Sequence, residues 1–271
     1  MFWKIPWILL KTKTMKIHHL RNATLIIESG NDFILVDPML GKKGTNGPLS
    51  FMRHKARRNP IVSLPKNSNE LLEKVTHCLI THCQRRHFDH LDTEGELFLV
   101  KNNIPVTCNS KDANYLKKRN INVQNILSPW KRDGFLEGNI TTVPAKHGYG
   151  WIHRLMANGV GFFIELPNSP TLYISGDTVY TNDVDKALST FKPDISIVAS
   201  GSASLDIGKP ILMTIKDIVK FIQNSPGKVI ANHLEALNHC PTTRKGLKEE
   251  LRKQNLLSKV FIPYDGETLQ F

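Results

Sequence analysis

Residues 81–92 read Thr-His-Cys-Gln-Arg-Arg-His-Phe-Asp-His-Leu-Asp, and they follow an apolar run that predicts a buried strand over 76–81. Three histidines and one aspartate, namely His82, His87, Asp89 and His90, fall within nine residues. Imidazoles crowded this closely would repel one another if protonated, and they gain little by packing. Divalent metal ions of borderline softness prefer neutral imidazole nitrogen together with carboxylate oxygen. We therefore interpret this segment as metal ligands held at the end of a strand.

Three more residues of the same kind lie farther along the chain, each directly after an apolar run that predicts a strand. They are His147, Asp177 and His233. Gly148 and Gly176 stand beside the first two and allow tight backbone turns there. Each residue alone is a weak signal, because an aspartate after a glycine at a strand end is usually a turn residue. Their order along the chain is a much stronger signal, and it predicts one metal-binding cluster.

The pattern around these points predicts short strands that later alternate with helices. Three strands open the chain at 16–20, 23–28 and 33–37, and a loop rich in Gly, Lys and Asn follows over 41–65. This alternation predicts sheet layers flanked by helices. Long ordered loops are often functional, so the 41–65 loop is a candidate part of the site.

Length and composition limit the class of protein. The chain has 271 residues, 40% hydrophobic and 22% charged, which is typical of a globular domain. No apolar run approaches the roughly 20 residues that cross a bilayer, so we expect no transmembrane segment. We predict one domain over 15–271 and interpret 1–14 as an N-terminal extension before Met15. A short interfacial anchor is the alternative for that extension, because its tryptophans and lysines suit a headgroup boundary.

The cysteines and the net charge bear on location and partners. Four cysteines with no CxxC pair argue against a disulfide framework and favour a reducing cytoplasm. The formal charge is +12, with one local basic cluster over 53–58. Net charge influences nonspecific association and does not by itself indicate an activity. We therefore expect a small anionic substrate and not a nucleic acid. The sequence leaves open whether the chain forms a homo-oligomer.

The order H-x-D-H, H, G-D, H resembles the metallo-β-lactamase fold superfamily, and within it the branch of L-ascorbate-6-phosphate lactonase and related hydrolases. The resemblance runs from Lys16 to the end of the chain, including segments 36–38, 175–178 and 232–240. It implies an α/β (α+β) fold, a four-layer αβ/βα sandwich with a binuclear site at the strand ends. Two divalent metal ions, zinc or manganese, would occupy that site.

The resemblance also implies a role for each residue of the cluster. His87 matches the second histidine of the HxHxDH motif, which serves the first metal, while Asp89 and His90 match the pair that serves the second. The downstream ligands follow in order: His147 for the first metal, Asp177 as the bridge between both, and His233 for the second.

The first histidine of the motif is where this sequence departs from the family. An ungapped alignment places Arg85 there, and a guanidinium cannot bind a metal. His82 follows the strand directly, where the family has its first ligand, so we assign the role to His82 and place a small insertion within 83–86. The alternatives are a structural His82 with a depleted first metal, or Cys83 as a substitute ligand.

A site of this kind predicts a metal-dependent hydrolase that activates a bridging hydroxide to cleave a lactone, ester or phosphodiester. Asp89 or Asp177 would orient the nucleophile. Asp37 would either orient a ligand histidine or cap its own turn. His239 would donate a proton or bind a substrate oxygen, and a structural role is the alternative. No GxSxG nucleophile motif is present. Two alternatives remain. One is a phosphodiesterase acting on nucleic acid or phospholipid, and the other is a metal-poor, non-catalytic binding protein that retains the fold.

Overall fold

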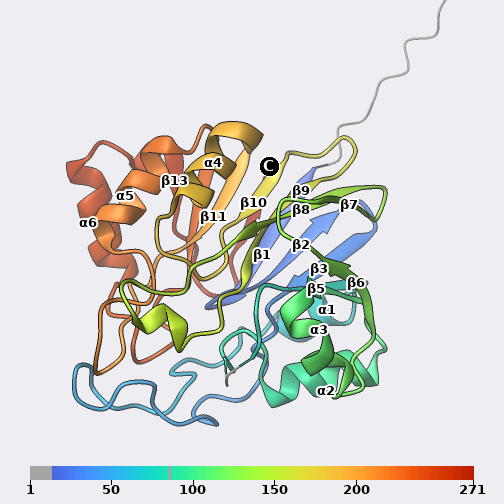
Figure 1. The fold of residues 1–271 in the computed structure, drawn as a ribbon, viewed down its shortest axis with the longest axis horizontal. Coiled ribbons are helices and arrows are strands. Elements are labelled where there is room, and N and C mark those ends of the chain that lie inside the picture. Colours follow the sequence, from blue (N-terminus) through green and yellow to red (C-terminus); the bar gives the residue numbers. More distant parts are fainter. Residues whose placement is uncertain (1–13, 85–86) are drawn as a thin grey trace, which may run out of the picture.

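A computed structural model describes residues 14–84 and 87–271. Within them, two seven-stranded sheets lie face to face (Figure 1). The first sheet has the order β14 (Thr268–Gln270), β1 (Met15–Arg21), β2 (Thr24–Ser29), β3 (Asp32–Val36), β4 (His77–Ile80), β5 (Val106–Asn109) and β6 (Val123–Leu127). The second has the order β13 (Val260–Phe261), β12 (Lys228–Asn232), β11 (Ile195–Ala199), β10 (Leu172–Ile174), β9 (Val160–Glu165), β8 (Gly138–Pro144) and β7 (Arg132–Phe135).

Helices cover the outer face of each sheet, which makes four layers (Figure 1). The first sheet carries α1 (Ser68–Leu72), α2 (Thr93–Lys101) and α3 (Ser110–Lys117), and the second carries α4 (Asn182–Phe191), α5 (Ile215–Asn224) and α6 (Arg244–Lys253). Two 3-10 turns, η1 (Ile152–Arg154) and η2 (Leu257–Lys259), lie in connections. The cap of α2 is Asp92, whose carboxylate accepts the Gly95 N–H. The predicted αβ/βα sandwich is confirmed.

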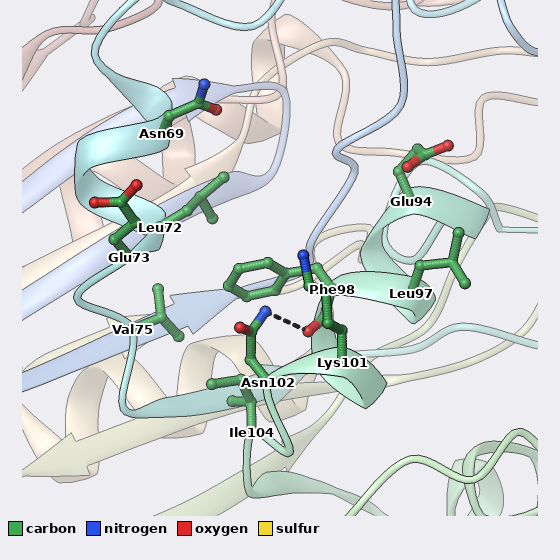
Figure 2. A pocket seen from close by; sticks show the side chains of 10 residues that line it. All are labelled: Asn69, Leu72, Glu73, Val75, Glu94, Leu97, Phe98, Lys101, Asn102 and Ile104. Carbon is green, nitrogen blue, oxygen red and sulfur yellow. Dashed lines mark hydrogen bonds between the residues drawn. The ribbon is translucent and has the colours of Figure 1, made fainter.

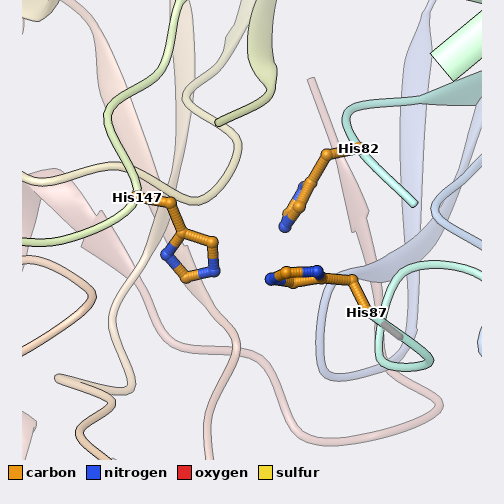
Figure 3. A group of neighbouring side chains, drawn as sticks. All are labelled: His82, His87 and His147. Carbon is orange, nitrogen blue, oxygen red and sulfur yellow. The ribbon is translucent and has the colours of Figure 1, made fainter. Parts of the chain in front are cut away.

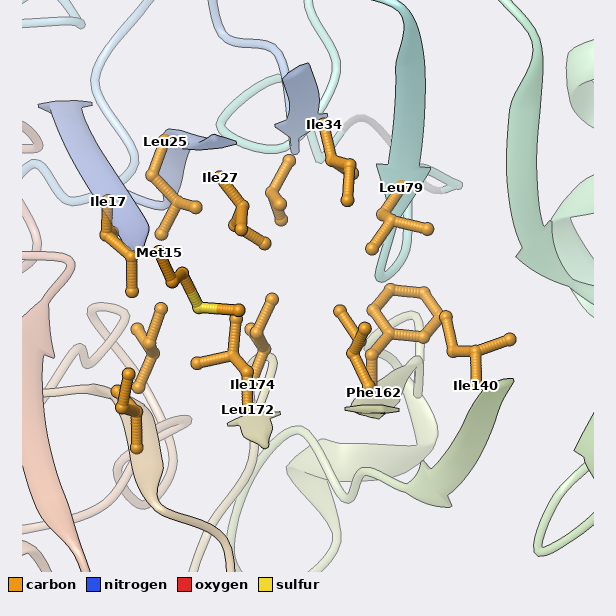
Figure 4. Packing of buried hydrophobic residues seen from close by; sticks show 14 of the residues in the cluster. Met15, Ile17, Leu25, Ile27, Ile34, Leu79, Ile140, Phe162, Leu172 and Ile174 are labelled. Atoms are coloured by element: carbon orange, nitrogen blue, oxygen red, sulfur yellow. The ribbon is translucent and has the colours of Figure 1, made fainter. Parts of the chain in front are cut away.

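The largest apolar layer lies between the two sheets (Figure 4). Ile27, Ile34 and Leu79 of the first sheet face Phe162 and Ile174 of the second, and all five are buried. Separate apolar clusters fill the space between each sheet and its own helices. Strands buried on both faces need near-continuous apolar sequence, which explains runs such as Ile195–Ala199.

The direction of the strands brings the predicted ligands to one edge. Strands β3 to β6 are parallel, as are β10 to β12, while β9 is antiparallel to both β8 and β10. Strand β8 therefore runs in the same direction as β10. The loops after β4, β8, β10 and β12 start at the carboxyl ends of their strands, where open α/β sheets commonly bind ligands.

The sequence pattern missed three strands, β6, β7 and β14. Strands β6 and β7 alternate exposed and half-buried residues, and β14 has three residues, so none presents an apolar run. All three are edge strands, whose formation depends on pairing rather than on burial. The predicted extension, 1–14, falls almost wholly outside the described residues, and β1 begins at Met15.

The four cysteines are free and buried. Among the helices of the described chain, none has the length and apolar character needed to span a membrane.

Phe162→Ala tests the contribution of the inter-sheet layer. Truncating this fully buried ring should lower the free energy of unfolding by about 3–5 kcal/mol, because the neighbouring sheets cannot close the cavity. Urea denaturation followed by circular dichroism measures the change. The exposed Phe51→Ala is the matched control and should stay within about 0.5 kcal/mol of the parent chain.

Candidate metal centre

Three buried histidines converge from two sheets (Figure 3). His82 follows β4, His87 lies in the loop beyond it, and His147 follows β8. One ring nitrogen of each lies within 4.8 Å of the corresponding atoms of the other two. His82, at the position that the sequence left in question, is therefore placed together with His87 and His147. Arg85, the alternative position, lies outside the described residues.

Each of these rings is held by a hydrogen bond at Nδ1. His87 Nδ1 donates to the Gln84 carbonyl at 2.5 Å, and His147 Nδ1 donates to the Ile211 carbonyl at 2.9 Å. His82 Nδ1 lies 3.1 Å from Thr81 Oγ1. These contacts leave Nε2 as the free ring atom, and Nε2 of His82 and of His87 has no hydrogen-bond partner among the described residues. Such fixed tautomers are typical of metal-ligating imidazoles.

A second buried group lies beside the first and consists of Asp89, His90, Asp177 and His233. His90 Nε2 lies 3.6 Å from Asp89 Oδ2, and so does His233 Nε2. The same two nitrogens have no hydrogen-bond partner in the described structure apart from these ionic contacts to carboxylates. The Nδ1 of His90 is occupied by Asp37, and that of His233 faces the Cys240 sulfur at 3.5 Å.

Asp177 lies between the two groups. Its Oδ2 is 3.1 Å from His90 Nε2 and 3.4 Å from His233 Nε2, and it is also 3.6 Å from His147 Nε2. One carboxylate oxygen thus touches ligands of both groups. Gly176 makes this placement feasible, because its φ is +60° and a Cβ there would lie 2.5 Å from the Val160 carbonyl oxygen.

The pKa values of His82 and His147 in the first group and of His90 in the second are shifted in opposite directions. Burial and the neighbouring His90 and His87 lower the pKa of His82 well below its ordinary value, and burial lowers the pKa of His147 to about 4. Burial acts to raise the pKa of Asp177, but His233 and His90 hold it well below its usual range. Asp177 in turn raises the pKa of His90 against the effect of burial.

These residues fit a pair of divalent cations. In the three-histidine group, lowered pKa values keep the imidazoles of His82 and His147 neutral, so their lone pairs are available. The second group offers two buried carboxylates with two more imidazoles. Buried polar atoms without partners are rare in folded proteins, so the unpartnered Nε2 atoms of His82 and His87 indicate that a ligand binds between them. Imidazole nitrogen with carboxylate oxygen is a donor set for divalent metal ions of borderline softness.

Asp37 lies behind the cluster, as expected, and orients one ligand. Its carboxylate accepts the His90 Nδ1–H at 2.8 Å and both the backbone N–H and the hydroxyl of Thr81, at 2.8 and 2.7 Å. The side chain is buried, and Asp37 has φ +45°.

His239, the predicted proton donor, is buried next to the cluster but belongs to neither ligand group. Its Nδ1 lies 3.8 Å from the Cys240 sulfur. Burial acts to lower the pKa of His239, but Cys240 and Asp89 outweigh it and raise that pKa above its usual value.

Sequence reasoning missed several supporting contacts. The backbone carbonyls of Gln84 and Ile211 have no signature in a sequence. Asn22 supports two ligands, a role that its residue type alone did not predict. Its carbonyl accepts the His233 N–H at 2.9 Å, and its amide donates to the Asp89 carbonyl at 3.2 Å. Gly159 lets the second sheet approach, because a Cβ there would lie 2.7 Å from the Cβ of His82.

A cavity of about 150 Å³ adjoins the three-histidine group and is lined by residues that include His82, Gln84, Lys111, Asp112 and Asn158. Another cavity, of about 630 Å³, lies between α1 and α2 on the outer face of the first sheet (Figure 2). It shares no lining residue with the histidine and aspartate cluster, so we do not assign it to the candidate centre.

Comparisons with known sequences agree with this geometry. The family described as Beta-lactamase superfamily domain matches residues 33–233. The UPF0173 protein YddR of Bacillus subtilis is 31% identical over 261 residues, covering 95% of this chain and all of the relative. A UPF0173 metal-dependent hydrolase of Alkaliphilus metalliredigens is 26% identical, covering 88% of this chain and 93% of its own length.

Two solved structures are similar over nearly their whole length. One, described as a possible metal-dependent hydrolase from Veillonella parvula, has a TM-score of 0.84 at 29% identity over 95% of this chain and 100% of its own. The other, an isothiocyanate hydrolase from Delia radicum gut bacteria, has a TM-score of 0.85 at 30% identity over 95% and 99%. Fold and cluster together define a metal-dependent hydrolase. The chain belongs to the metallo-β-lactamase superfamily.

His82→Ala tests the first ligand position. Removing one of three imidazoles should reduce the metal held by this group as strongly as His87→Ala does, because both Nε2 atoms point to the same place. Elemental analysis of the purified variants measures this. His153→Ala is the matched control, since His153 belongs to neither group, and Arg85→Ala should also leave metal content intact. Full metal occupancy in His82→Ala alongside loss in His87→Ala would make His82 structural.

Proposed function

We propose that this chain hydrolyses a small substrate with a water molecule activated between two divalent cations, zinc or manganese. The observation that carries the proposal is the position of Asp177, whose Oδ2 touches His147 of one ligand group and His90 and His233 of the other. Cations held by these two groups would lower the pKa of bound water and so supply hydroxide near neutral pH.

The side chains around the centre have separable tasks. Asp89 and Asp177 would orient the attacking water by accepting a hydrogen bond from it, and neighbouring histidines hold both buried carboxyl groups ionised. His239 would donate a proton to the leaving group, which agrees with its burial beside Cys240 and with the raised pKa that Cys240 and Asp89 give it. Asp37 fixes the His90 ring, so it is a positioning residue.

The substrate is a small, anionic lactone, ester or phosphodiester, as in the lactonase-like branch that the sequence resembles. A cavity of about 150 Å³ beside His82 supports a small molecule, because it adjoins the proposed metal ligands. Lys111 in its lining supplies a positive charge for an anion. A phosphodiesterase acting on nucleic acid or phospholipid is the alternative within enzymes. A metal-poor binding protein is disfavoured, because it would leave the Nε2 atoms of His82 and His87 without a ligand.

An isothiocyanate is a second candidate substrate. The isothiocyanate hydrolase is 30% identical and similar over nearly the full length of both chains, which is the observation that favours it. In this reaction water adds to the central carbon of R–N=C=S and the C–N bond breaks. The oxygen leaves in carbonyl sulfide, and both protons end on the amine nitrogen. The same activated water serves both candidates.

Metal content and turnover test the proposal directly. Protein purified without chelator or added metal should hold about two equivalents of transition metal per chain. Hydrolysis of lactone, ester, phosphodiester and isothiocyanate probes should then identify the bond. A folded preparation that holds no metal, and gains no activity with zinc or manganese, would overturn the proposal that this chain is an enzyme.

Asp177→Asn tests the shared carboxylate. The substitution keeps the size of the side chain but removes the charge that holds two cations close together. It should lose at least one metal equivalent and slow hydrolysis at least a hundredfold, while circular dichroism shows a folded chain. Asp183→Asn, at a half-buried position in the first turn of α4 and outside both ligand groups, is the control for the same chemical change. Unchanged activity in Asp177→Asn would make Asp177 a turn residue.

A further inference from the structure

Exposed apolar side chains gather on three loops at the carboxyl-terminal edge of the sheets. Within the described residues, five of the ten large hydrophobic side chains that are exposed belong to these loops. They are Phe51 and Met52 after β3, Trp151 and Leu155 around η1, and Ile207 after β11, with exposed fractions between 55% and 82%. Exposed side chains this large, gathered in one region, often mark an interaction surface.

The three loops form one continuous face, which we call the loop face. Asp206 accepts the backbone N–H groups of Phe51, Met52 and Arg53, at 2.9 to 3.1 Å, and so ties the loop after β3 to the loop after β11. The second junction lies at Gly208, where a Cβ would come within 3.4 Å of Ile152 in η1.

The loop face is strongly basic. Segment 41–65 contains no Asp or Glu and has six lysines and arginines, all of them exposed: Lys42, Lys43, Arg53, Lys55, Arg57 and Arg58. The carboxylate of Asp206 is already satisfied by backbone N–H groups and by the Ser50 hydroxyl at 2.5 Å. The apolar side chains therefore stand among cations with little acidic charge nearby.

The loop face borders the candidate centre. His54 Nε2 lies 2.9 Å from Ser204 Oγ, and the Ser204 N–H donates to the His239 carbonyl at 3.0 Å. A partner seated on the loop face would therefore lie next to the side of the cluster that holds His239.

The chemistry of the loop face selects among partners. Aromatic and aliphatic side chains among lysines and arginines suit the boundary of a bilayer, where apolar groups enter the acyl region and cations meet lipid phosphates. A second copy is disfavoured, because isologous pairing would bring six cations against six. A nucleic acid would satisfy the cations but leave Met52, Leu155 and Ile207 without an apolar environment.

We propose that the loop face docks the protein peripherally on a bilayer that contains anionic lipid, with the metal centre held next to the membrane surface. This inference is independent of the bond that the enzyme cleaves. It requires both components of the surface: the cations for attraction and the apolar side chains for insertion.

Flotation of the full-length protein with lipid vesicles tests the proposal. The protein should bind vesicles of phosphatidylcholine mixed with phosphatidylglycerol, bind phosphatidylcholine alone at least tenfold more weakly, and dissociate as salt is raised. Lys55→Gln with Arg57→Gln should weaken binding about twenty-five-fold, because each cation near an anionic surface contributes a factor of roughly five. Phe51→Ser with Met52→Ser should weaken it at least tenfold.

Matched variants elsewhere control for general effects. Leu97→Ser with Val100→Ser changes exposed apolar residues on α2, and Lys117→Gln with Lys118→Gln changes exposed lysines of α3 and its cap. Both should bind like the parent chain, and all variants should keep its circular dichroism and metal content.

Three outcomes would overturn membrane docking: no binding to the mixed vesicles, equal losses in test and control variants, or loss in the lysine–arginine variant with none in Phe51→Ser/Met52→Ser. The last result would indicate a polyanion such as nucleic acid. A dimer that Phe51→Ser/Met52→Ser dissociates in the absence of vesicles would instead make the loop face an interface between copies.

Discussion

The carboxylate of Asp37 is the interaction on which the metal centre depends. It accepts the Thr81 N–H, the Thr81 hydroxyl and the His90 Nδ1–H, and so ties both ends of the segment 81–90 to one buried group at the end of β3. A segment fixed at both ends can change length in its middle without moving its first and last ligands. This explains how His82 and His90 reach the cluster although the spacing between His82 and His87 departs from the family motif.

The centre is a concentration of buried polar groups that the rest of the fold must stabilise. In the absence of cations, ionised Asp177 and Asp89 are balanced by His90 and His233, whose pKa values they raise against the effect of burial. Bound cations would take over that balance and release protons, because ligating imidazoles must be neutral. The apolar layer between the sheets supplies the stability that such a cluster does not. Function and stability are thus separated along the strands: side chains between the sheets hold them together, and residues just beyond their carboxyl ends form the site.

Sequence reasoning succeeded where the signal is local and chemical. Histidines and aspartates directly after apolar runs predicted seven residues that the structure brings into two adjoining groups. It failed where structure depends on distant pairing. The strands β6, β7 and β14 exist because a neighbouring strand completes their hydrogen bonds, and the ring of His147 is oriented by a carbonyl at Ile211, 64 residues away. Backbone carbonyls are present at every residue, so no residue type could have marked that one.

The loop face follows from the same topology as the metal centre. Parallel strands deliver their following loops to one edge, so the segments that carry ligands and the segments that carry Phe51, Trp151 and Ile207 have to share it. Gly148, with φ +125°, turns the chain from His147 directly into the loop that bears Trp151. Apolar side chains in these loops cannot be buried in the inter-sheet layer, because that layer lies between the strands and not beyond their ends. Exposure of these side chains is therefore the result of placing long loops at the edge where the metal ligands also lie.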